Sequence, residues 1–390
     1  MKDKIIYFDN AATTPVKDEV LEAMLPYFTQ YYGNASSIYS IGRESKRAIE
    51  EARDRVAMAL GSLPEEMFFT GSGTEADNWA IKGIAYANRH KGNHIITTII
   101  EHHAVLHTCK YLEEDGFKVT YLPVDGNGLV NPEQVRNAIK PNTILITIMF
   151  ANNEIGTVQP IAQIGKIAKE KRVYFHTDAV QAIGTIKVNV NELNVDLLSL
   201  SAHKFYGPKG IGALFLRKGT KISSFLHGGA QERGRRASTE NVAAIVGLGK
   251  AIEIAAANVD QYNEKLIALR DRTIFEIMHR IPYVKLNGDM KRRLPGNVNF
   301  SFEFIEGEAL LLMLDMKGIC ASSGSACTSG SLDPSHVLLA IGLPHEIAHG
   351  SLRITFGEEN TSSDVDHLIE VLPEIIQRLR EMSPLYETHT

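Results

Sequence analysis

Short apolar runs alternate with amphipathic stretches between about residues 65 and 217. Seven of the runs have the length of strands: Met67–Thr70, His94–Ile100, Val119–Leu122, Thr143–Phe150, Val173–Thr177, Leu197–Leu200 and Ile211–Leu216. Strands that alternate with helical patterns are typical of βαβ units and a mostly parallel sheet. The pattern therefore predicts an α/β fold with a mostly parallel seven-stranded sheet flanked by helices.

Helical spacing flanks this region on both sides. Residues Arg43–Leu60 place apolar side chains on one face, and Gly61 is a stop signal. Asn241–Met278 has the length of one long helix. The remainder predicts strand, helix, strand and helix at Gly296–Phe302, Gly307–Met316, Ser351–Phe356 and Ser362–Met382. We expect a smaller α+β domain that begins near residue 262.

Composition narrows the class of protein. A chain of 390 residues with 44% hydrophobic and 22% charged residues is typical of a globular protein, and its length favours two domains. The formal net charge of −5, with no block of like charges, favours neither a nucleic-acid nor a membrane partner. Polar residues interrupt each apolar stretch before about 20 residues, and no signal-peptide pattern opens the chain. Three cysteines without a CxxC pair fit reduced thiols, so we expect a cytoplasmic protein.

Polar side chains follow several of the predicted strands. Lys204 comes directly after one strand, where a lysine is usually a solvated loop residue. Asp178 ends another strand, at the edge where parallel sheets bind ligands, and either caps the next segment or holds a pyridine nitrogen protonated. Gln181 lies three residues further on, within reach of a phenolic oxygen. Together these residues favour a pyridoxal phosphate site over a surface loop.

A glycine-rich turn offers an anion site. Gly71–Glu75 stands after a strand and opens a helix, so the backbone around Gly73 and the hydroxyl of Thr74 point to a phosphate. The turn matches neither GxGxxG nor the P-loop, and a plain capped turn is the alternative. Ser201 and His203 add further donors, which makes phosphate binding the better interpretation.

Histidines follow a third strand. His102 offers an imidazole that can stack on a flat ring. His103 and His107 have the i, i+4 spacing of a two-histidine metal site, but no third ligand pattern accompanies them. Surface or core histidines are the favoured interpretation.

Two further positions bear on a substrate. Asn153 follows an apolar strand, where amides serve a turn or a ligand, and Arg353 lies inside an apolar strand, where a guanidinium needs a partner such as a substrate carboxylate. Residues 321–331 are small apart from one thiol, Cys327, which is therefore accessible and suited to be a nucleophile. Cys109 and Cys320 are expected to be small core residues.

These segments together resemble the class V aminotransferase family, and more closely its NifS/IscS-type cysteine desulfurases. The resemblance is carried in order by Asp9–Pro15, Thr74–Asn78, Glu101–His102, Asn152–Gly156, Asp178–Gln181, Ser201–Lys204, Gln231–Arg236 and Ser323–Cys327. It implies a fold type I pyridoxal-phosphate-dependent transferase that forms a homodimer with the cofactor near the subunit boundary. It also implies a large domain of residues 15–261 and a small domain of residues 1–14 and 262–390 that carries the cysteine loop.

The resemblance further implies a role for each matching residue. Lys204 would be the Schiff-base lysine, His102 the ring-stacking imidazole, Asp178 the pyridinium partner and Gln181 the contact to the phenolic oxygen. Gly73, Thr74, Ser201 and His203 would hold the phosphate, Thr239 would reach the phosphate of the other subunit, and Asn153 and Arg353 would hold the substrate. Ser238 departs from the family pattern, where a glycine is usual and would permit a positive φ.

The implied reaction converts L-cysteine to L-alanine and leaves the sulfur on Cys327 as a persulfide, for an acceptor such as an iron–sulfur scaffold protein. A transient iron–sulfur ligand at Cys327 is an added hypothesis. The alternatives are a selenocysteine lyase or another class V lyase or aminotransferase on the same fold, and a non-catalytic metal or sulfur carrier built around His103, His107 and the cysteines.

Overall fold

The computed structural model describes residues 5–323 and 334–387. Its main sheet has seven strands in the order β2-β8-β7-β6-β5-β3-β4. They are β2 (Met67–Thr70), β3 (His94–Thr98), β4 (Lys118–Leu122), β5 (Thr143–Thr147), β6 (Tyr174–Asp178), β7 (Leu197–Ser201) and β8 (Gly212–Leu216). β8 runs antiparallel to both of its neighbours, and the other pairs are parallel. The predicted mostly parallel seven-stranded sheet is confirmed.

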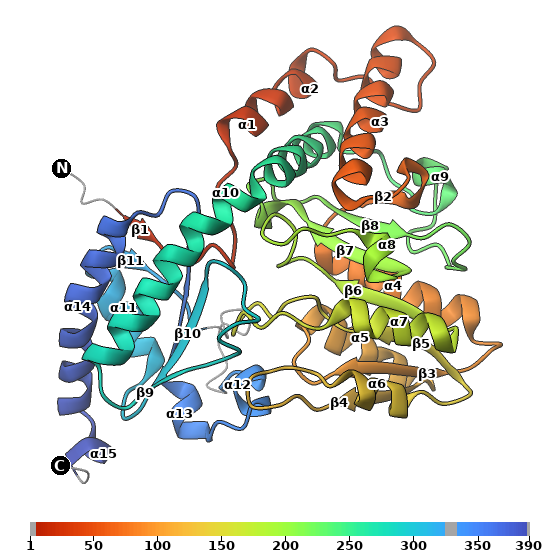
Figure 1. The fold of residues 1–390 in the computed structure, drawn as a ribbon. Helices are drawn as coiled ribbons and strands as arrows, with labels where there is room; N and C mark the ends of the chain where they lie inside the picture. Colours follow the sequence, from red (N-terminus) through yellow and green to blue (C-terminus); the bar gives the residue numbers. More distant parts are fainter. Residues whose placement is uncertain (1–4, 324–333, 388–390) are drawn as a thin grey trace.

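Helices cover both faces of this sheet (Figure 1). The helices before residue 242 are α1 (Asp18–Met24), α2 (Pro26–Thr29), α3 (Ser40–Leu60), α4 (Gly73–Asn88), α5 (His103–Glu114), α6 (Pro132–Ala138), α7 (Ile161–Lys171), α8 (Val190–Leu193) and α9 (Gln231–Gly234). One hydrophobic cluster joins α4 and α5 to the sheet around the buried Trp79, and another joins α3 and α7 to the opposite face around Phe175. The α3 helix ends at Gly61, whose φ of 67° satisfies the predicted stop.

Strands β3 and β5 end earlier than the apolar runs that predict them. Ile99 and Ile100 after β3, and Ile148–Phe150 after β5, leave the ladder although most of these side chains stay buried. Periodicity cannot separate a buried strand from the buried loop that follows it. Those loops lead into the site described below.

The second part of the molecule has its own sheet and core. Strands β9 (Val284–Leu286), β10 (Asn297–Phe302) and β12 (Ser351–Thr355) are antiparallel in the order β12-β10-β9. Helices α11 (Gly307–Asp315), α12 (His336–Ala340), α13 (His345–His349), α14 (Ser362–Glu381) and α15 (Pro384–Glu387) accompany it. The N-terminal strand β1 (Ile6–Tyr7) pairs in parallel with β11 (Ile319–Cys320), so the chain's first described residues belong to this part.

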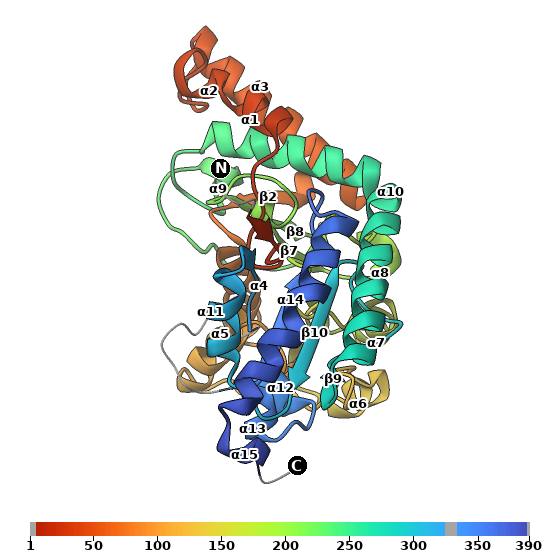
Figure 2. The ribbon, with the colours of Figure 1, turned by 90° about the vertical axis from the view of Figure 1, so that its left-hand side faces the viewer.

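One helix, α10 (Val242–Arg280), joins the two parts (Figures 1 and 2). Ile252 packs into the core beneath the main sheet, whereas Leu266 packs into the core of the second part. The predicted domain boundary at residue 262 falls inside this continuous helix, and the division into 15–261 and the rest stays a prediction. Among the described residues, α10 is the one helix long and apolar enough to cross a bilayer, but 56% of its most apolar window is buried in the protein. That burial is typical of a core helix.

Candidate active site

The lysine singled out from the sequence is fixed by the N-terminal segment. After β7 ends, a single turn of 3-10 helix over Ala202–Lys204 turns the chain. Lys204 Nζ donates hydrogen bonds to the carbonyl oxygens of Ala11, at 2.5 Å, and Ala12, at 2.8 Å. The backbone N–H and the hydroxyl of Thr14 both donate to the carbonyl of His203 at 3.0 Å. The amine is therefore held in a defined place at the carboxyl end of the sheet.

A buried carboxylate at the end of β6 and an imidazole that follows β3 line the same cavity as this amine. Asp178, the last residue of β6, accepts the backbone N–H of Val180 at 2.9 Å. Burial raises the pKa of Asp178, and the nearby His102, Val180 N–H and Lys204 oppose that shift. His102 caps α5 by accepting the N–H of Ala104 on Nδ1 at 3.1 Å, so its other nitrogen carries the ring proton. Burial lowers the pKa of His102, which keeps the ring neutral.

The turn between β2 and α4 approaches the same place. Ser72 caps α4, because its hydroxyl accepts the N–H of Glu75 at 3.1 Å. A side chain at Gly73 would place its Cβ 2.7 Å from Val180 and 3.3 Å from Ser201. Only glycine lets the start of α4 come this close to the ends of β6 and β7. The first residues of α4 and Asp178 therefore line the same cavity, where a helix N-terminus favours an anion.

Arg353 closes the site from the second part of the molecule. This residue of β12 is 3% exposed and donates from Nη2 to the Asp9 carboxylate at 2.8 Å and from Nη1 to the carbonyl of Asn153 at 2.9 Å. Its Nε is buried and has no hydrogen-bond partner in the described part of the chain. The sequence required a partner for this guanidinium, and Asp9 supplies one within the protein. The Nε–H group of the same guanidinium keeps no partner among the described residues.

These groups line a single cavity of about 320 Å³. Its lining includes the predicted Gly73, Thr74, His102, Asn153, Asp178, Gln181, Ser201, His203, Lys204 and Arg353. An amine, a buried carboxylate and a helix N-terminus with hydroxyl donors match the aldehyde, the pyridine nitrogen and the phosphate of pyridoxal phosphate. The donor set of the cavity therefore fits this cofactor. The individual roles stay predictions.

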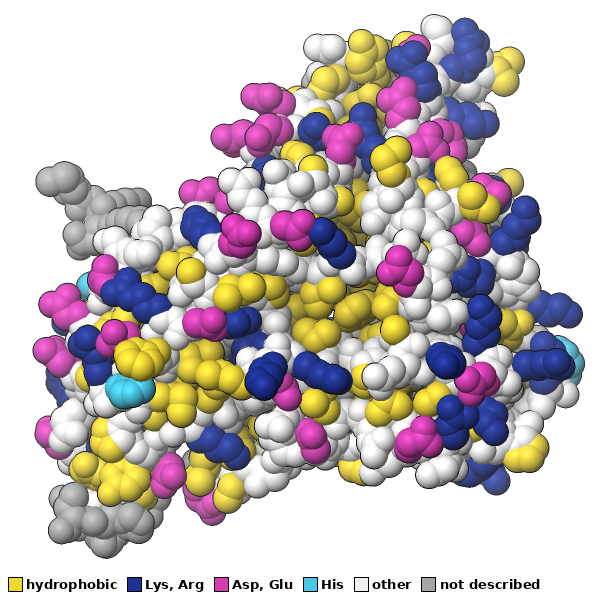
Figure 3. All heavy atoms as spheres, in the orientation of Figure 1, with side chains coloured by type: hydrophobic (Ala, Val, Ile, Leu, Met, Phe, Trp, Pro, Cys, Tyr) yellow, Lys and Arg dark blue, Asp and Glu magenta, His cyan; other side chains and the backbone are white. Residues whose placement is uncertain are grey.

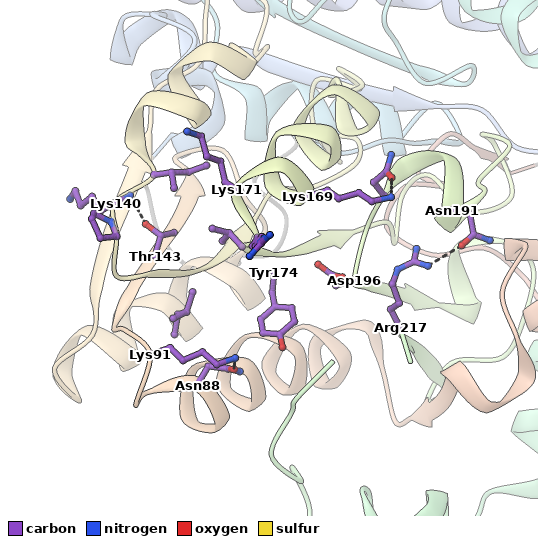
Figure 4. A pocket seen from close by; sticks show the side chains of 16 residues that line it. Asn88, Lys91, Lys140, Thr143, Lys169, Lys171, Tyr174, Asn191, Asp196 and Arg217 are labelled. Atoms are coloured by element: carbon purple, nitrogen blue, oxygen red, sulfur yellow. Dashed lines mark hydrogen bonds between the residues drawn. The ribbon is translucent and has the colours of Figure 1, made fainter. Parts of the chain in front are cut away.

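A larger hollow of about 920 Å³ lies at the opposite edge of the sheet, beside the first residues of β5 and β6 (Figure 4). It is lined mainly by cations and amides, including Lys91, Lys140, Lys169, Lys171 and Arg217. None of the predicted site residues that the structure describes lines it. The smaller cavity is therefore the candidate active site because of the residues that line it, although the other hollow is larger.

Several predicted residues lie elsewhere. Thr239 is exposed and does not line the cavity of this chain. Cys327 lies outside the described residues. Cys109 is fully buried as expected, but the prediction that Cys320 is a core residue is wrong, because this residue of the two-residue strand β11 is only partly buried. A short edge strand does not cover its own side chains.

The rings of His103 and His107 lie 5.0 Å apart, and the ring of His336 lies 4.9 Å from that of His103. Within residues 5–323 and 334–387, however, no group of three ligating side chains could hold a metal ion. The sequence reasoning assigned no role to Asp9, Ala11 or Ala12, because two of these act through backbone carbonyls that leave no residue-type signal.

Comparison with known proteins agrees with this geometry. Residues 6–368 match the family described as aminotransferase class-V. A cysteine desulfurase IscS of Clostridium botulinum is 63% identical over 99% of this chain and 98% of its own length, and one of Methanosarcina thermophila is 64% identical over 98% and 95%. A solved NifS-like protein superimposes with a TM-score of 0.91 at 40% identity, covering 96% of this chain and all of its own. A structure titled SspA in complex with cysteine reaches 0.81 at 41% identity, over 90% and 98%.

The fold and the site thus define an α/β enzyme of the pyridoxal-phosphate-dependent type. The chain belongs to the class V aminotransferase family. The expected family and fold class are confirmed.

Proposed function

We propose that this protein is a cysteine desulfurase. The observation that carries the proposal is one cavity that holds the Lys204 amine, the Asp178 carboxylate and the N-terminus of α4 together. The reaction is balanced as L-cysteine plus the Cys327 thiol giving L-alanine plus the Cys327 persulfide. The carbon–sulfur bond of the substrate breaks, a sulfur–sulfur bond forms, and the hydrogen atoms are redistributed without an external oxidant or reductant. The full-length IscS relatives favour this activity over the lyase and aminotransferase alternatives.

Pyridoxal phosphate supplies the carbonyl that binds the substrate amine and the electron sink that weakens bonds at its α-carbon. Asp178 would hold the cofactor nitrogen with a charge-assisted hydrogen bond. His102 in its neutral form would hold the cofactor ring, and Gly73, Thr74, Ser201 and His203 would hold the phosphate. Gln181, whose amide donates to Ala11 at 3.0 Å, would contact the phenolic oxygen of the cofactor.

The remaining residues act on the substrate. Arg353 and Asn153, which both line the cavity, bind the substrate carboxylate. Lys204 Nζ takes the proton from the substrate α-carbon. The Cys327 thiolate attacks the substrate sulfur, and the persulfide is then passed to an acceptor.

The test uses two variants of the purified holoenzyme. Cys327→Ser is expected to abolish sulfide release from L-cysteine in the presence of a thiol reductant and to keep the visible cofactor absorbance. Lys204→Ala is expected to lose both sulfide release and the wild-type absorbance. Sulfide production that survives Cys327→Ser would contradict the sulfur-transfer role. A metal or sulfur carrier would instead be colourless and unaffected by Lys204→Ala.

We also propose a homodimer in which Thr239 contacts the phosphate of the neighbouring subunit. Exposed apolar side chains gather on the projecting part built from α1, α2 and the start of α3 (Figure 3), including Phe28, Tyr32 and Ile38. Such a patch is typical of a surface that another chain covers. Ile38→Asp is expected to shift sedimentation towards the monomer, whereas the control Met316→Asp, on a side chain that is 85% exposed at the end of α11, leaves the dimer intact. An unchanged sedimentation coefficient in Ile38→Asp would place the interface elsewhere.

The proposed setting is the cytoplasm, with an iron–sulfur scaffold protein as sulfur acceptor and neither nucleic acid nor membrane as partner. Trapping the persulfide in the presence of candidate acceptors, and analysing the mixed disulfides, tests the acceptor directly.

A further inference from the structure

A second carboxyl lies behind Asp178. Asp77, on the first turns of α4, is 1% exposed, lines the same cavity and lies within hydrogen-bonding reach of Asp178. The nearby Ser199 hydroxyl of β7 lowers the pKa of Asp77, against the larger effect of burial. Asp77 Oδ1 has no hydrogen-bond partner among the residues that the structure describes, and His176 Nε2 lies 3.5 Å from it. The proposed function assigns Asp77 no role.

Two buried carboxyl groups in hydrogen-bond contact must share a proton, because a hydrogen bond between them needs a donor and two adjacent charges repel. Asp178 is the better anion of the two. It accepts a backbone N–H from Val180 and lies near the Lys204 amine, which stabilises negative charge. In the described part of the chain, the groups that act on Asp77 include no lysine or arginine.

The other titratable groups around Asp77 lead to the same assignment. Burial lowers the pKa of His176 to about 3, so this ring is neutral, and its two nitrogens already contact Ser199 and Thr147 at 2.9 and 2.8 Å. Burial also raises the pKa of Glu101, to about 8, and this carboxyl group adds no positive charge near Asp77. Burial and the neighbouring Asp178 together raise the pKa of Asp77 well above its ordinary value.

We propose that Asp77 is a positioning residue that keeps its proton and donates a hydrogen bond to Asp178, so that Asp178 meets the cofactor nitrogen as an oriented anion. This inference rests on the proposed cofactor site, but its test reads the proton and the cofactor affinity, not sulfide release. An asparagine can replace a protonated aspartate, since its amide N–H is also a donor. It cannot replace an ionised one.

The experiment compares wild type, Asp77→Asn and Asp77→Ala. Asp77→Asn is expected to keep the cofactor dissociation constant within about twofold and to keep the visible spectrum and its pH dependence. Asp77→Ala is expected to weaken cofactor binding about tenfold or more, as the loss of a hydrogen bond to a charged acceptor implies. An Asn variant that resembles the Ala variant, or an Ala variant that resembles wild type, would overturn the proposal.

Infrared difference spectroscopy at neutral pH measures the proton itself. The difference between wild type and Asp77→Asn is expected to show the C=O stretch of a protonated acid in the wild type. The matched control Asp115→Asn, which removes an exposed carboxylate paired with Arg89, is expected to show only a carboxylate band. A carboxylate band for Asp77 would refute its assigned proton even if Asp77→Ala does not fold. If the wild type shows the protonated-acid band of Asp77 but releases no sulfide from L-cysteine, the proposed desulfurase function is wrong and the proposal for Asp77 stands.

Discussion

Ser238 occupies a backbone conformation that favours glycine, and replacing it with glycine is expected to stabilise the protein. Its φ is 107°, well outside the left-handed region that other residues enter. Such a conformation costs a residue with a Cβ about 1–3 kcal/mol. Glycine removes that cost but loses about 0.5–1 kcal/mol through the greater freedom of its unfolded chain. The net gain is about 1 kcal/mol.

Calorimetry on the cofactor-free protein measures this gain. An unfolding entropy of about 2.1 cal/mol/K per residue corresponds to about 0.8 kcal/mol/K for a chain of this length, so Ser238→Gly should raise Tm by about 1 °C. The control Ser238→Ala keeps the Cβ and therefore the strain, and its Tm should not rise. The reasoning is refuted if Ser238→Gly gives no increase, or if Ser238→Ala gives the same one.

Three further outcomes are expected. Arg53→Ala should lower the free energy of unfolding by about 3–5 kcal/mol, because Glu232, held by Arg53 at 2.8 and 2.9 Å, would remain as a buried unpaired charge; the urea midpoint measures this, and a loss below 1 kcal/mol would contradict it. Burial lowers the pKa of His94 from 6.5 to about 4, so as pH falls the unfolded chain binds a proton at this residue before the folded protein does. The wild type should therefore lose stability between about pH 6.5 and pH 4. The free energy of unfolding of His94→Gln should fall less between pH 7 and pH 5, and an equal fall would contradict the lowered pKa. Arg353→Lys should raise KM for L-cysteine about tenfold and change kcat less, because a lysine cannot serve Asp9 and a carboxylate at once; an unaltered KM in steady-state assays would exclude a substrate contact.

The sequence predicted those features that depend on local patterns. The seven apolar runs became the seven strands of the main sheet, and the spacing from residue 241 became α10, because burial on both faces and helical periodicity leave clear signals. The positive φ of Ser238 was also foreseeable, since the family pattern has glycine there.

The features that the sequence did not predict depend on distant parts of the chain. Asp77 stands in the first turns of an amphipathic helix, where a carboxylate is normally exposed, and β6, about a hundred residues later, is what buries it. The carbonyls of Ala11 and Ala12 leave no trace in residue type, yet they hold the Lys204 amine. A backbone contact of this kind appears only when the fold is known.

The position of β1 has a consequence for the order in which this protein can mature. Asp9 and Arg353 are 344 residues apart in the chain, and β1 pairs with β11. During synthesis β1 and Asp9 leave the ribosome more than 300 residues before β11 and Arg353, their partners in the folded protein. The main sheet can form earlier, with the lysine in place and the segment that holds its amine still unattached. A chain that lacks β12 lacks Arg353 and therefore cannot complete the site.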